Sequence, residues 1–164
     1  MLDLTPSQKG AVAETEIATA AIRMNLLVLR PVAEGGRYDL AIDIGEKILR
    51  VQCKWASRNG DVLTINCETS RHTPNGYLRT RYSASEVDAI AAYSPDSDRC
   101  YVIPIEEAEH MSTISLRLAP TRNNQALRIR WAREYEFETS LRRRWLQAAD
   151  DLPITRPAEL RAIR

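Results

Sequence analysis

The stretch from residue 38 to residue 55 constrains the fold more than any other part of the chain. Residues 38–44 and residues 47–55 each alternate apolar and polar side chains, which is the pattern of a β-strand that covers a core with one face. Only Gly45 and Glu46 separate the two segments, so we expect them to pair antiparallel across a tight turn. The chain is therefore predicted to be built on a sheet.

The same alternation decides which polar side chains lie together. Gln52 and Lys54 are two residues apart in the second strand, so they share one face of it. Asp39 lies at the end of the first strand that antiparallel pairing brings beside them. The sequence thus predicts that an acid, an amide and a lysine lie side by side on two neighbouring strands.

A helix is expected to contribute a fourth polar side chain. Thr5 and Pro6 suit the start of a helix that runs to about Asn25. At about 100° per residue, Glu14 falls on the apolar stripe that packs on the sheet, where a carboxylate is costly unless it is paired or bound to a cation. Glu16 lies off this stripe and is interpreted as a surface acid.

The remaining pattern predicts a mixed α/β or α+β fold. Further strands are expected at 26–29, 62–67, 87–93, 99–103 and 114–118, a short helix at 104–109, a long polar loop at 70–83, and a last helix at 135–149. We expect one domain over residues 1–149 and a flexible tail over residues 150–164. No apolar run of about 18 residues and no secretory signal is visible, so a cytoplasmic protein without a membrane span is expected.

Charge distribution favours a phosphate-rich partner more than the net charge of +1 does. Six basic residues stand against two acidic ones between Arg50 and Arg81, and five against one between Thr113 and Glu134. The alternative is that these arginines are balanced in space by acids from elsewhere in the chain. The three cysteines form no CxxC pair, which predicts reduced, buried thiols.

The chemistry open to Glu14, Asp39, Gln52 and Lys54 is that of a divalent metal ion. Carboxylate and amide oxygens are ligands for Mg²⁺, which makes Glu14, Asp39 and Gln52 candidate metal ligands, with Mn²⁺ as a substitute ion. A bound ion polarises a phosphodiester and activates water, and Lys54 would stabilise the charge that develops. In the alternative, Asp39 is a turn acid, Gln52 and Lys54 belong to an exposed sheet face, and Glu14 pairs with Lys54.

These residues also carry a family resemblance. The order of Glu14, then Tyr38-Asp39-Leu40, then Gln52-Cys53-Lys54 resembles the PD-(D/E)XK nuclease superfamily. The closer similarity is to its group I intron homing-endonuclease branch and bacterial relatives. That similarity rests on Lys9-Gly10 before Glu14, Arg30-Pro31, Arg37 to Leu40, Leu49 to Lys54, Tyr93 to Asp96, Tyr101 to Ile105, Arg122 to Gln125, Ile129 to Ala132 and Tyr135-Glu136.

The resemblance implies a restriction-endonuclease-like core, with a central mixed sheet flanked by helices. It implies metal-dependent hydrolysis of double-stranded DNA, with Glu14 and Asp39 as metal-associated acids and Lys54 as the catalytic lysine. It also implies a homo-oligomer, either a dimer or a tetramer. Gln52 departs from the acid usual in the superfamily but agrees with the intron-encoded branch, so the number of metal ions stays open. A junction-resolving nuclease and a catalytically silent DNA-binding or assembly module remain alternatives.

Two further groups of residues are candidate DNA contacts. Arg71, Arg79 and Arg81 lie in the expected long loop, together with His72 and Tyr82, and a merely solvated loop is the alternative. Arg37 is assigned to DNA as well. Arg122, Asn123, Asn124 and Gln125 suit base-edge contacts, since amides pair with adenine, although a structural turn is the alternative.

Overall fold

The structure is a computed structural model that describes residues 3–33, 35–74, 76–120 and 128–146. Its helices are α1 (Pro6–Arg23), α2 (Ile105–Ala108), α3 (Ala132–Tyr135) and α4 (Phe137–Leu141), followed by a π-helical turn η1 (Arg142–Leu146). Its strands are β1 (Leu27–Leu29), β2 (Leu40–Asp43), β3 (Ile48–Trp55), β4 (Ser57–Asn59), β5 (Val62–Asn66), β6 (Glu68–Thr73), β7 (Gly76–Arg81), β8 (Ala89–Ser94), β9 (Arg99–Pro104) and β10 (Thr113–Arg117).

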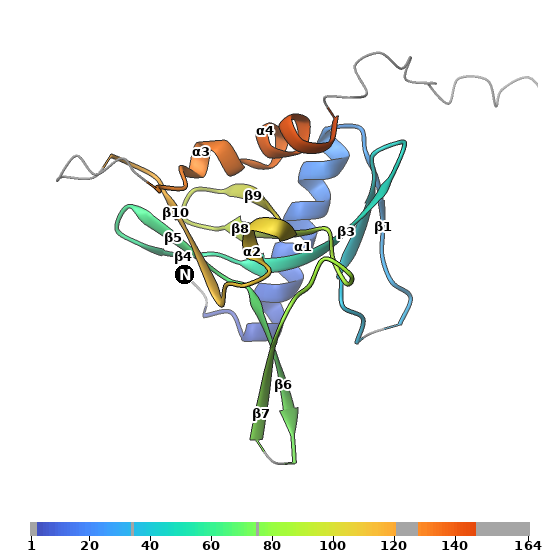
Figure 1. Cartoon of the computed structure of the whole chain (residues 1–164), viewed down its shortest axis with the longest axis vertical. Helices are drawn as coiled ribbons and strands as arrows, with labels where there is room; N and C mark the ends of the chain where they lie inside the picture. The colour runs from blue at the N-terminus through green and yellow to red at the C-terminus, as the bar shows by residue number, and fades with distance from the viewer. Residues whose placement is uncertain (1–2, 34, 75, 121–127, 147–164) are drawn as a thin grey trace, which may run out of the picture.

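A central mixed sheet organises these elements in the order β1-β2-β3-β8-β9 (Figure 1). Strands β3 and β8 run parallel, whereas the other neighbouring pairs are antiparallel. A three-stranded sheet, β10-β5-β4, and a two-stranded hairpin, β6-β7, complete the described strands. The expected mixed sheet flanked by helices is therefore confirmed.

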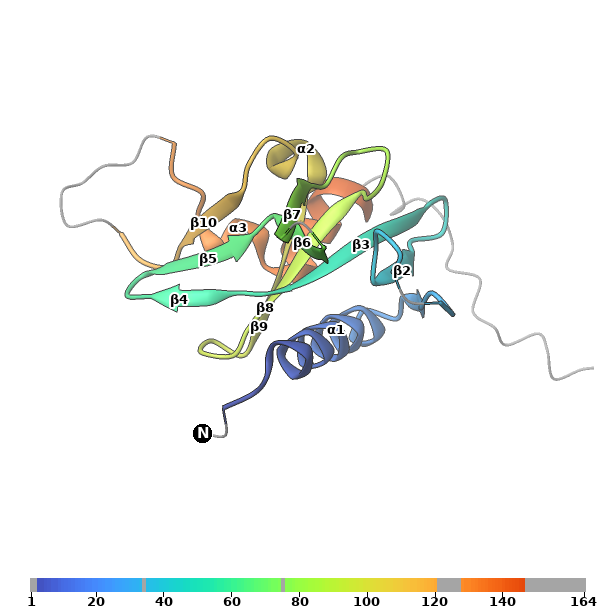
Figure 2. The same cartoon turned by 90° about the horizontal axis from the view of Figure 1, so that it is seen from below.

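The central sheet is buried on both faces by different elements. Helix α1 packs under one face, where Ile17 and Ala21 meet Leu40, Leu49 and Val51. Strands β5 and β10 and helix α2 lie on the opposite side, as Figure 2 shows. Since side chains alternate along β3, residues of this strand serve both layers.

Helix α1 follows from its local sequence. The Thr5 side chain accepts a hydrogen bond from the Gln8 N–H, the Gln8 side chain accepts one from the Thr5 N–H, and Pro6 occupies the first turn. The helix ends at Arg23, and Asn25 turns the chain with a φ of 61°. This is within two residues of the predicted end.

The prediction of a long loop over residues 70–83 is wrong. Most of these residues form the hairpin β6-β7, in which Glu68 pairs with Arg81 and Thr73 with Gly76. Gly76 has a φ of 110°, which a tight turn between two strands requires and which glycine adopts at little cost. The hairpin projects away from the body of the molecule (Figure 1).

Smaller differences concern the bounds of elements. Asp39 was expected inside a strand over 38–44, but β2 begins at Leu40, so Asp39 precedes it. The helix expected over 135–149 is two short helices and a π-helical turn as far as Leu146, and residues 147–149 lie outside the described residues, as does the expected tail over 150–164. Strand β4 was not predicted.

The remaining predictions concern the cysteines and a membrane span. All three cysteines are free, and Cys53 and Cys67 are buried as predicted, whereas Cys100 is half-buried. Within the described residues, no helix combines the length and the apolar character that crossing a membrane requires.

Candidate functional site

The site begins at a place where the central sheet is incomplete. Strand β2 pairs with β3 only from Ile48 to Val51, so the second half of β3 has no partner from β2. Asp39 occupies this place: its backbone N–H donates to the Val51 carbonyl at 3.0 Å. Its carboxylate Oδ2 accepts the backbone N–H of Cys53 at 2.8 Å. A side chain thus satisfies a strand N–H that would otherwise lack a partner.

Gln52 completes the polar edge beside Asp39. Its side chain is only 9% exposed, and its Nε2 donates a hydrogen bond to Asp39 Oδ2. Both hydrogen bonds that the Asp39 carboxylate accepts fall on Oδ2, so among the described residues Asp39 Oδ1 and Gln52 Oε1 accept no hydrogen bond. These two oxygens are the ones that remain for a further ligand.

Glu14 reaches the same edge from α1. Its side chain is 31% exposed, although its helix neighbours Ala13 and Ile17 are fully buried. Arg30 lies 3.3 Å from it as an ion-pair partner. Burial and the charge of Asp39 raise the pKa of the Glu14 carboxyl, while the Arg30 charge lowers it. The two carboxylates are therefore close enough to repel one another.

Asp39 has the same electrostatic character. Burial raises the pKa of its carboxyl, against the opposing effects of the Cys53 N–H, the Lys54 charge and the Gln52 amide. A buried carboxylate whose charge is disfavoured by burial is stabilised by a nearby cation. Glu16, by contrast, is half-buried on α1. Burial first, and then the Glu16 charge, raise the pKa of Cys100, so Glu16 lies toward β9 and not beside Asp39.

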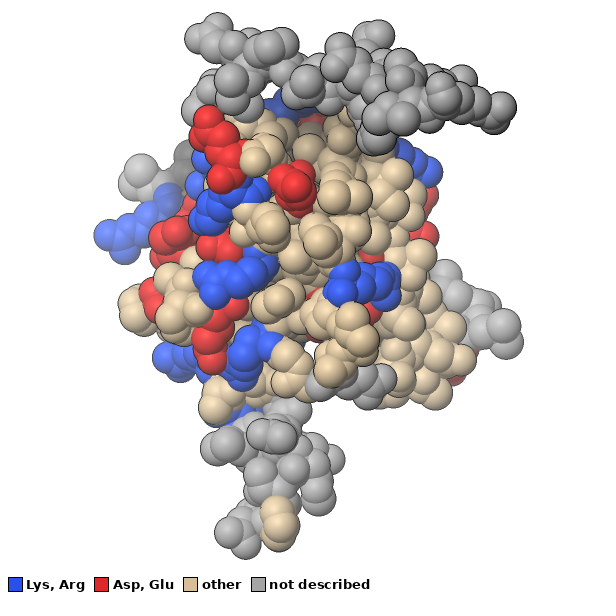
Figure 3. Space-filling model, turned by 90° about the vertical axis from the view of Figure 1, so that its right-hand side faces the viewer, with Lys and Arg blue, Asp and Glu red and all other residues tan. Residues whose placement is uncertain are grey.

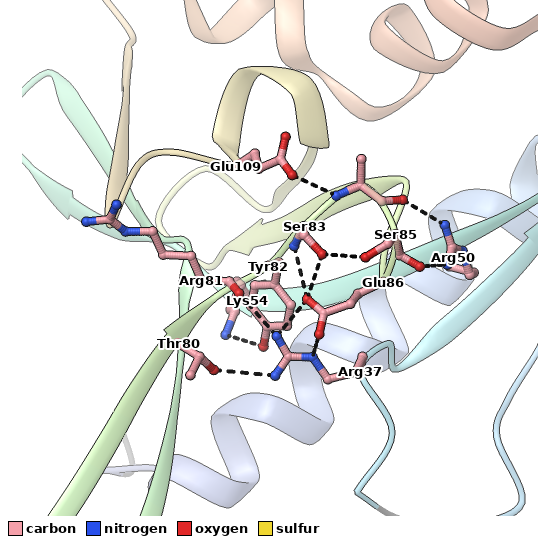
Figure 4. Close-up of polar contacts among 11 residues, drawn as sticks. Arg37, Arg50, Lys54, Thr80, Arg81, Tyr82, Ser83, Ser85, Glu86 and Glu109 are labelled. Carbon is pink, nitrogen blue, oxygen red and sulfur yellow. Dashed lines mark hydrogen bonds and ion pairs between the residues drawn. The ribbon is translucent and has the colours of Figure 1, made fainter.

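Lys54 lies beside this edge and contacts the base of the hairpin. Its Nζ donates to the Glu68 carbonyl at 2.9 Å. It also donates to the Tyr82 hydroxyl at 3.3 Å (Figure 4). The same nitrogen lies 5.0 Å from the centre of the Tyr82 ring. The predicted group of Asp39, Gln52 and Lys54 is thus assembled as the strand alternation indicated, with Glu14 beside it.

The residues expected to contact DNA differ in their surroundings: some have partners within the protein and others are exposed. Arg37 has partners within the protein, since it lies 2.7 Å from Glu86 and stacks over Tyr82 at 4.9 Å. Arg81 lies 3.7 Å from Glu68, and Arg79 is exposed on β7. The side chain of Arg71 and all of residues 122–125 lie outside the described part of the structure.

Several basic residues are balanced in space by acids. Asp88 lies 3.0 Å from both Lys47 and Arg50, and Glu107 lies 2.7 Å from Arg144 and 3.8 Å from Arg130. On the side of the molecule that carries β1, Figure 3 shows acidic and basic side chains interleaved along one margin. Charge counts along the sequence therefore overstate the basic surface available to DNA.

Sequence reasoning missed the roles of three residues. Arg30 entered only as part of an Arg-Pro motif, yet it is the cation nearest to Glu14. Tyr82 was expected to contact DNA, but it is 4% exposed and contacts Lys54. Glu86 was not singled out at all, and nothing in the local sequence indicates that it pairs with Arg37, 49 residues away.

The donor set fits a hard divalent ion with few protein ligands. Glu14, Asp39 Oδ1 and Gln52 Oε1 are oxygen donors at one edge, and Mg²⁺ usually keeps several waters beside one or two carboxylates. In the part of the chain that the structure describes, no group of three or more His, Cys, Asp or Glu side chains gathers to hold a metal.

Comparisons with known proteins place this geometry in a family. Residues 4–138 match the profile of the PD-(D/E)XK endonuclease family. Among solved structures, the bacterial homing endonuclease I-Ssp6803I is similar, with a TM-score of 0.70 and 23% sequence identity, over 90% of this chain and 98% of that one. No curated protein matches significantly.

The family match spans most of the chain and includes all four candidate site residues, so this protein belongs to the PD-(D/E)XK endonuclease family. Its general function is that of a nuclease. The resemblance to the homing-endonuclease branch is confirmed at the level of the fold, which the chain shares with I-Ssp6803I.

Proposed function

We propose that this chain is a divalent-metal-dependent DNA endonuclease, with Glu14, Asp39, Gln52 and Lys54 as its active-site residues. One observation carries the proposal. The Asp39 carboxylate, the Gln52 amide and the Lys54 ammonium group lie together at the second half of β3, which β2 does not reach. The Glu14 carboxylate approaches them from α1. The raised pKa of both carboxyls marks a place where a bound cation lowers the free energy of the folded protein.

Each residue has a separate task in this proposal. Glu14, Asp39 Oδ1 and Gln52 Oε1 would hold Mg²⁺, or Mn²⁺ in its place. The ion supplies Lewis-acid polarisation of the phosphate and a water of lowered pKa. Lys54 neutralises charge that develops on the phosphate oxygens, and the Cys53 N–H holds Asp39 in place.

Double-stranded DNA is the proposed substrate. The exposed Arg79 on the projecting hairpin supports this assignment, since arginine side chains bind phosphate and position a duplex. Residues 122–125 stay candidates for base contacts.

Self-association as a dimer or tetramer is also proposed. Large apolar side chains remain exposed on the described surface: Ile22, Leu27, Leu29, Val32 and Ile48. Leu27 and Ile48 both stand in register with Asp43, so together with Leu29 they share one face of the central sheet. Contiguous exposed apolar surface is typical of protein–protein contacts. Light scattering coupled to size exclusion measures the mass directly, and a monomer at micromolar concentration would contradict this part of the proposal.

The activity is tested on a library of random duplexes, with sequencing of every new end, because the target is not specified by the site. Wild type is incubated with Mg²⁺, with Mn²⁺ or with chelator, beside Asp39→Ala and Lys54→Ala. Cleavage should need the metal and fall at least about 100-fold in both variants. Lys47→Ala and Glu16→Gln are matched controls outside the site and should cut like wild type.

Other outcomes separate the alternatives. Metal-independent cleavage, or unchanged cutting by Asp39→Ala, would overturn the proposal. DNA binding with no cleavage under any condition would favour a silent binding or assembly module. Cutting confined to four-way junctions, added as a separate substrate, would favour a junction-resolving nuclease.

A further inference from the structure

The ammonium group of Lys54 is held by the base of the β6-β7 hairpin. Its two hydrogen-bond acceptors are the carbonyl of Glu68, the first residue of β6, and the hydroxyl of Tyr82, which directly follows β7. Glu68 and Arg81 are paired in the hairpin, so both acceptors lie at its base. A long lysine side chain loses considerable rotamer freedom when it is fixed in this way, and the two bonds offset that cost.

Tyr82 is itself fixed by a second cation. The Arg37 guanidinium lies 4.9 Å from the centre of the Tyr82 ring and donates to the Arg81 carbonyl at 3.2 Å. Figure 4 shows Arg37 and Lys54 on either side of the Tyr82 side chain. A cation over an aromatic face is an attractive contact, and it is stronger at a buried ring such as this one.

Glu86 holds Arg37 in this orientation. Its carboxylate lies within 2.9 Å of two guanidinium nitrogens and also accepts the Ser83 N–H and hydroxyl, each at 3.1 Å. Hydrogen bonding to Arg37 lowers the pKa of the Glu86 carboxyl. Glu86 therefore stays charged at neutral pH, and the chain of contacts runs from Glu86 through Arg37 and Tyr82 to Lys54.

We propose that Tyr82, braced by Arg37 and Glu86, is the positioning residue for the candidate catalytic lysine, Lys54. Tyr82 is 4% exposed, so it acts through Lys54 and does not touch DNA. The proposal rests on the proposed function in one respect, namely that Lys54 takes part in cleavage. Arg37 then belongs to the same positioning set, which explains why a residue next to the Asp39 motif has its guanidinium turned toward the protein.

The contact between Tyr82 and Lys54 is tested without an activity assay. The chain has three lysines, Lys9, Lys47 and Lys54, so brief acetylation followed by mass spectrometry gives one rate for each. Lys54 should react slowly in metal-free wild type, with Lys47, whose side chain is 52% exposed, as the internal reference. Tyr82→Phe should raise the Lys54 rate about tenfold, the effect expected from one lost hydrogen bond to a charged group. Tyr93→Phe, which removes a hydroxyl bonded to Asp98, is the matched control.

The consequence for cleavage is tested by a double-mutant cycle. Tyr82→Phe should lower kcat about tenfold and leave KM and DNA affinity unchanged, since it alters the position of one catalytic group. In a Lys54→Ala background, the same substitution should change the residual rate by less than about twofold. Circular dichroism and urea unfolding confirm that each variant is folded, and Glu86→Gln, which leaves the tyrosine in place, serves as a second variant.

The two proposals fail in different ways. An unchanged Lys54 acetylation rate in Tyr82→Phe would overturn the positioning role, whatever the activity of wild type. An equal loss of kcat in the wild-type and Lys54→Ala backgrounds would overturn it as well, because Tyr82 would then act independently of Lys54. Wild type that never cuts, with Lys54 protected by Tyr82 as expected, would contradict the proposed function and leave the contact established.

Discussion

The carboxylate of Asp39 accepts the backbone N–H of Cys53 at 2.8 Å, at the point where β3 loses its antiparallel neighbour. One side chain therefore takes the place of a strand carbonyl and is also the central acid of the candidate site. This double role ties the stability of the sheet edge to the proposed chemistry, and substitutions at Asp39 separate the two.

Asparagine and alanine at position 39 should differ in stability but not in activity. Asparagine keeps an oxygen for the Cys53 N–H, whereas alanine leaves this donor unpaired beside a buried strand. We expect Asp39→Asn to be about 1–3 kcal/mol more stable than Asp39→Ala, while both lose cleavage. Urea unfolding in the presence of chelator measures the stability of each variant, and the duplex-library assay measures its cleavage. Equal stability would show that water satisfies the Cys53 N–H.

The metal-free protein should lose stability as the pH rises through the raised pKa values of Glu14 and Asp39. Both carboxyls have a pKa above the ordinary values of 4.5 and 3.8, so the folded state binds more protons than the unfolded state in that window. Stability is then greatest below the ordinary values and falls as the pH increases through the folded-state pKa. Urea unfolding in chelator across this range measures the slope.

The control for this slope is the matched pair Glu14→Gln and Asp39→Asn, each of which should flatten it. Saturating Mg²⁺ should flatten the slope or reverse its sign, because the ion favours the charged carboxylates of the folded state. Glu86 and Asp88 have lowered pKa values, so their contribution is lost only as the pH falls below the ordinary range. In the metal-free protein, a stability that rises with pH through the raised pKa values would contradict the burial of the two acids.

Gln52→Glu should lower the stability of the metal-free protein and raise its affinity for the metal ion. The substitution adds a carboxylate at a position that is 9% exposed and removes the amide that donates to Asp39. We expect the metal-free variant to be less stable than wild type at neutral pH, and Mn²⁺ to bind it tighter by roughly tenfold or more, since charge on the ligands sets affinity. Isothermal titration measures the affinity. Gln52→Met, of similar length, should bind the ion more weakly than wild type, and tighter binding by this variant would exclude Gln52 as a ligand.

Two isoleucines of α1, the helix that carries Glu14, test how strongly its packing on the sheet stabilises the fold. Ile17 is fully buried against the sheet, whereas Ile22 is 61% exposed on the same helix. Ile17→Ala should cost about 2–5 kcal/mol, and Ile22→Ala less than about 1 kcal/mol. Thermal and urea unfolding give both values. Comparable losses would show that Ile22 is covered by another copy of the chain.

The register of β2 and β3 could be predicted because two local rules agree. Alternation fixes the faces of β3, and the two-residue turn at Gly45 and Glu46 fixes the direction of β2, so Asp39 falls beside Gln52. The helix period likewise selects Glu14 over Glu16. These relationships depend on residues close in sequence, which is why the sequence alone indicates them.

The hairpin β6-β7 was missed for a local reason. Its strands carry arginine, histidine and threonine in place of an apolar face, so the periodicity that marks a buried strand is absent. The Asn75-Gly76 pair was a usable signal, as Asn-Gly favours a hairpin turn. The contacts of Tyr82 with Lys54 and of Glu86 with Arg37 join distant segments, and no rule based on neighbouring residues indicates them.

The early end of β2 has a consequence for how this fold tolerates change. If β2 continued for two more residues toward its N-terminus, its backbone would satisfy the Cys53 N–H and the sheet would gain hydrogen bonds. The same extension would displace Asp39 from its bonding position. A stability-guided redesign of this chain would therefore tend to complete the sheet and remove the site, and selection for thermal stability alone should yield folded variants without function.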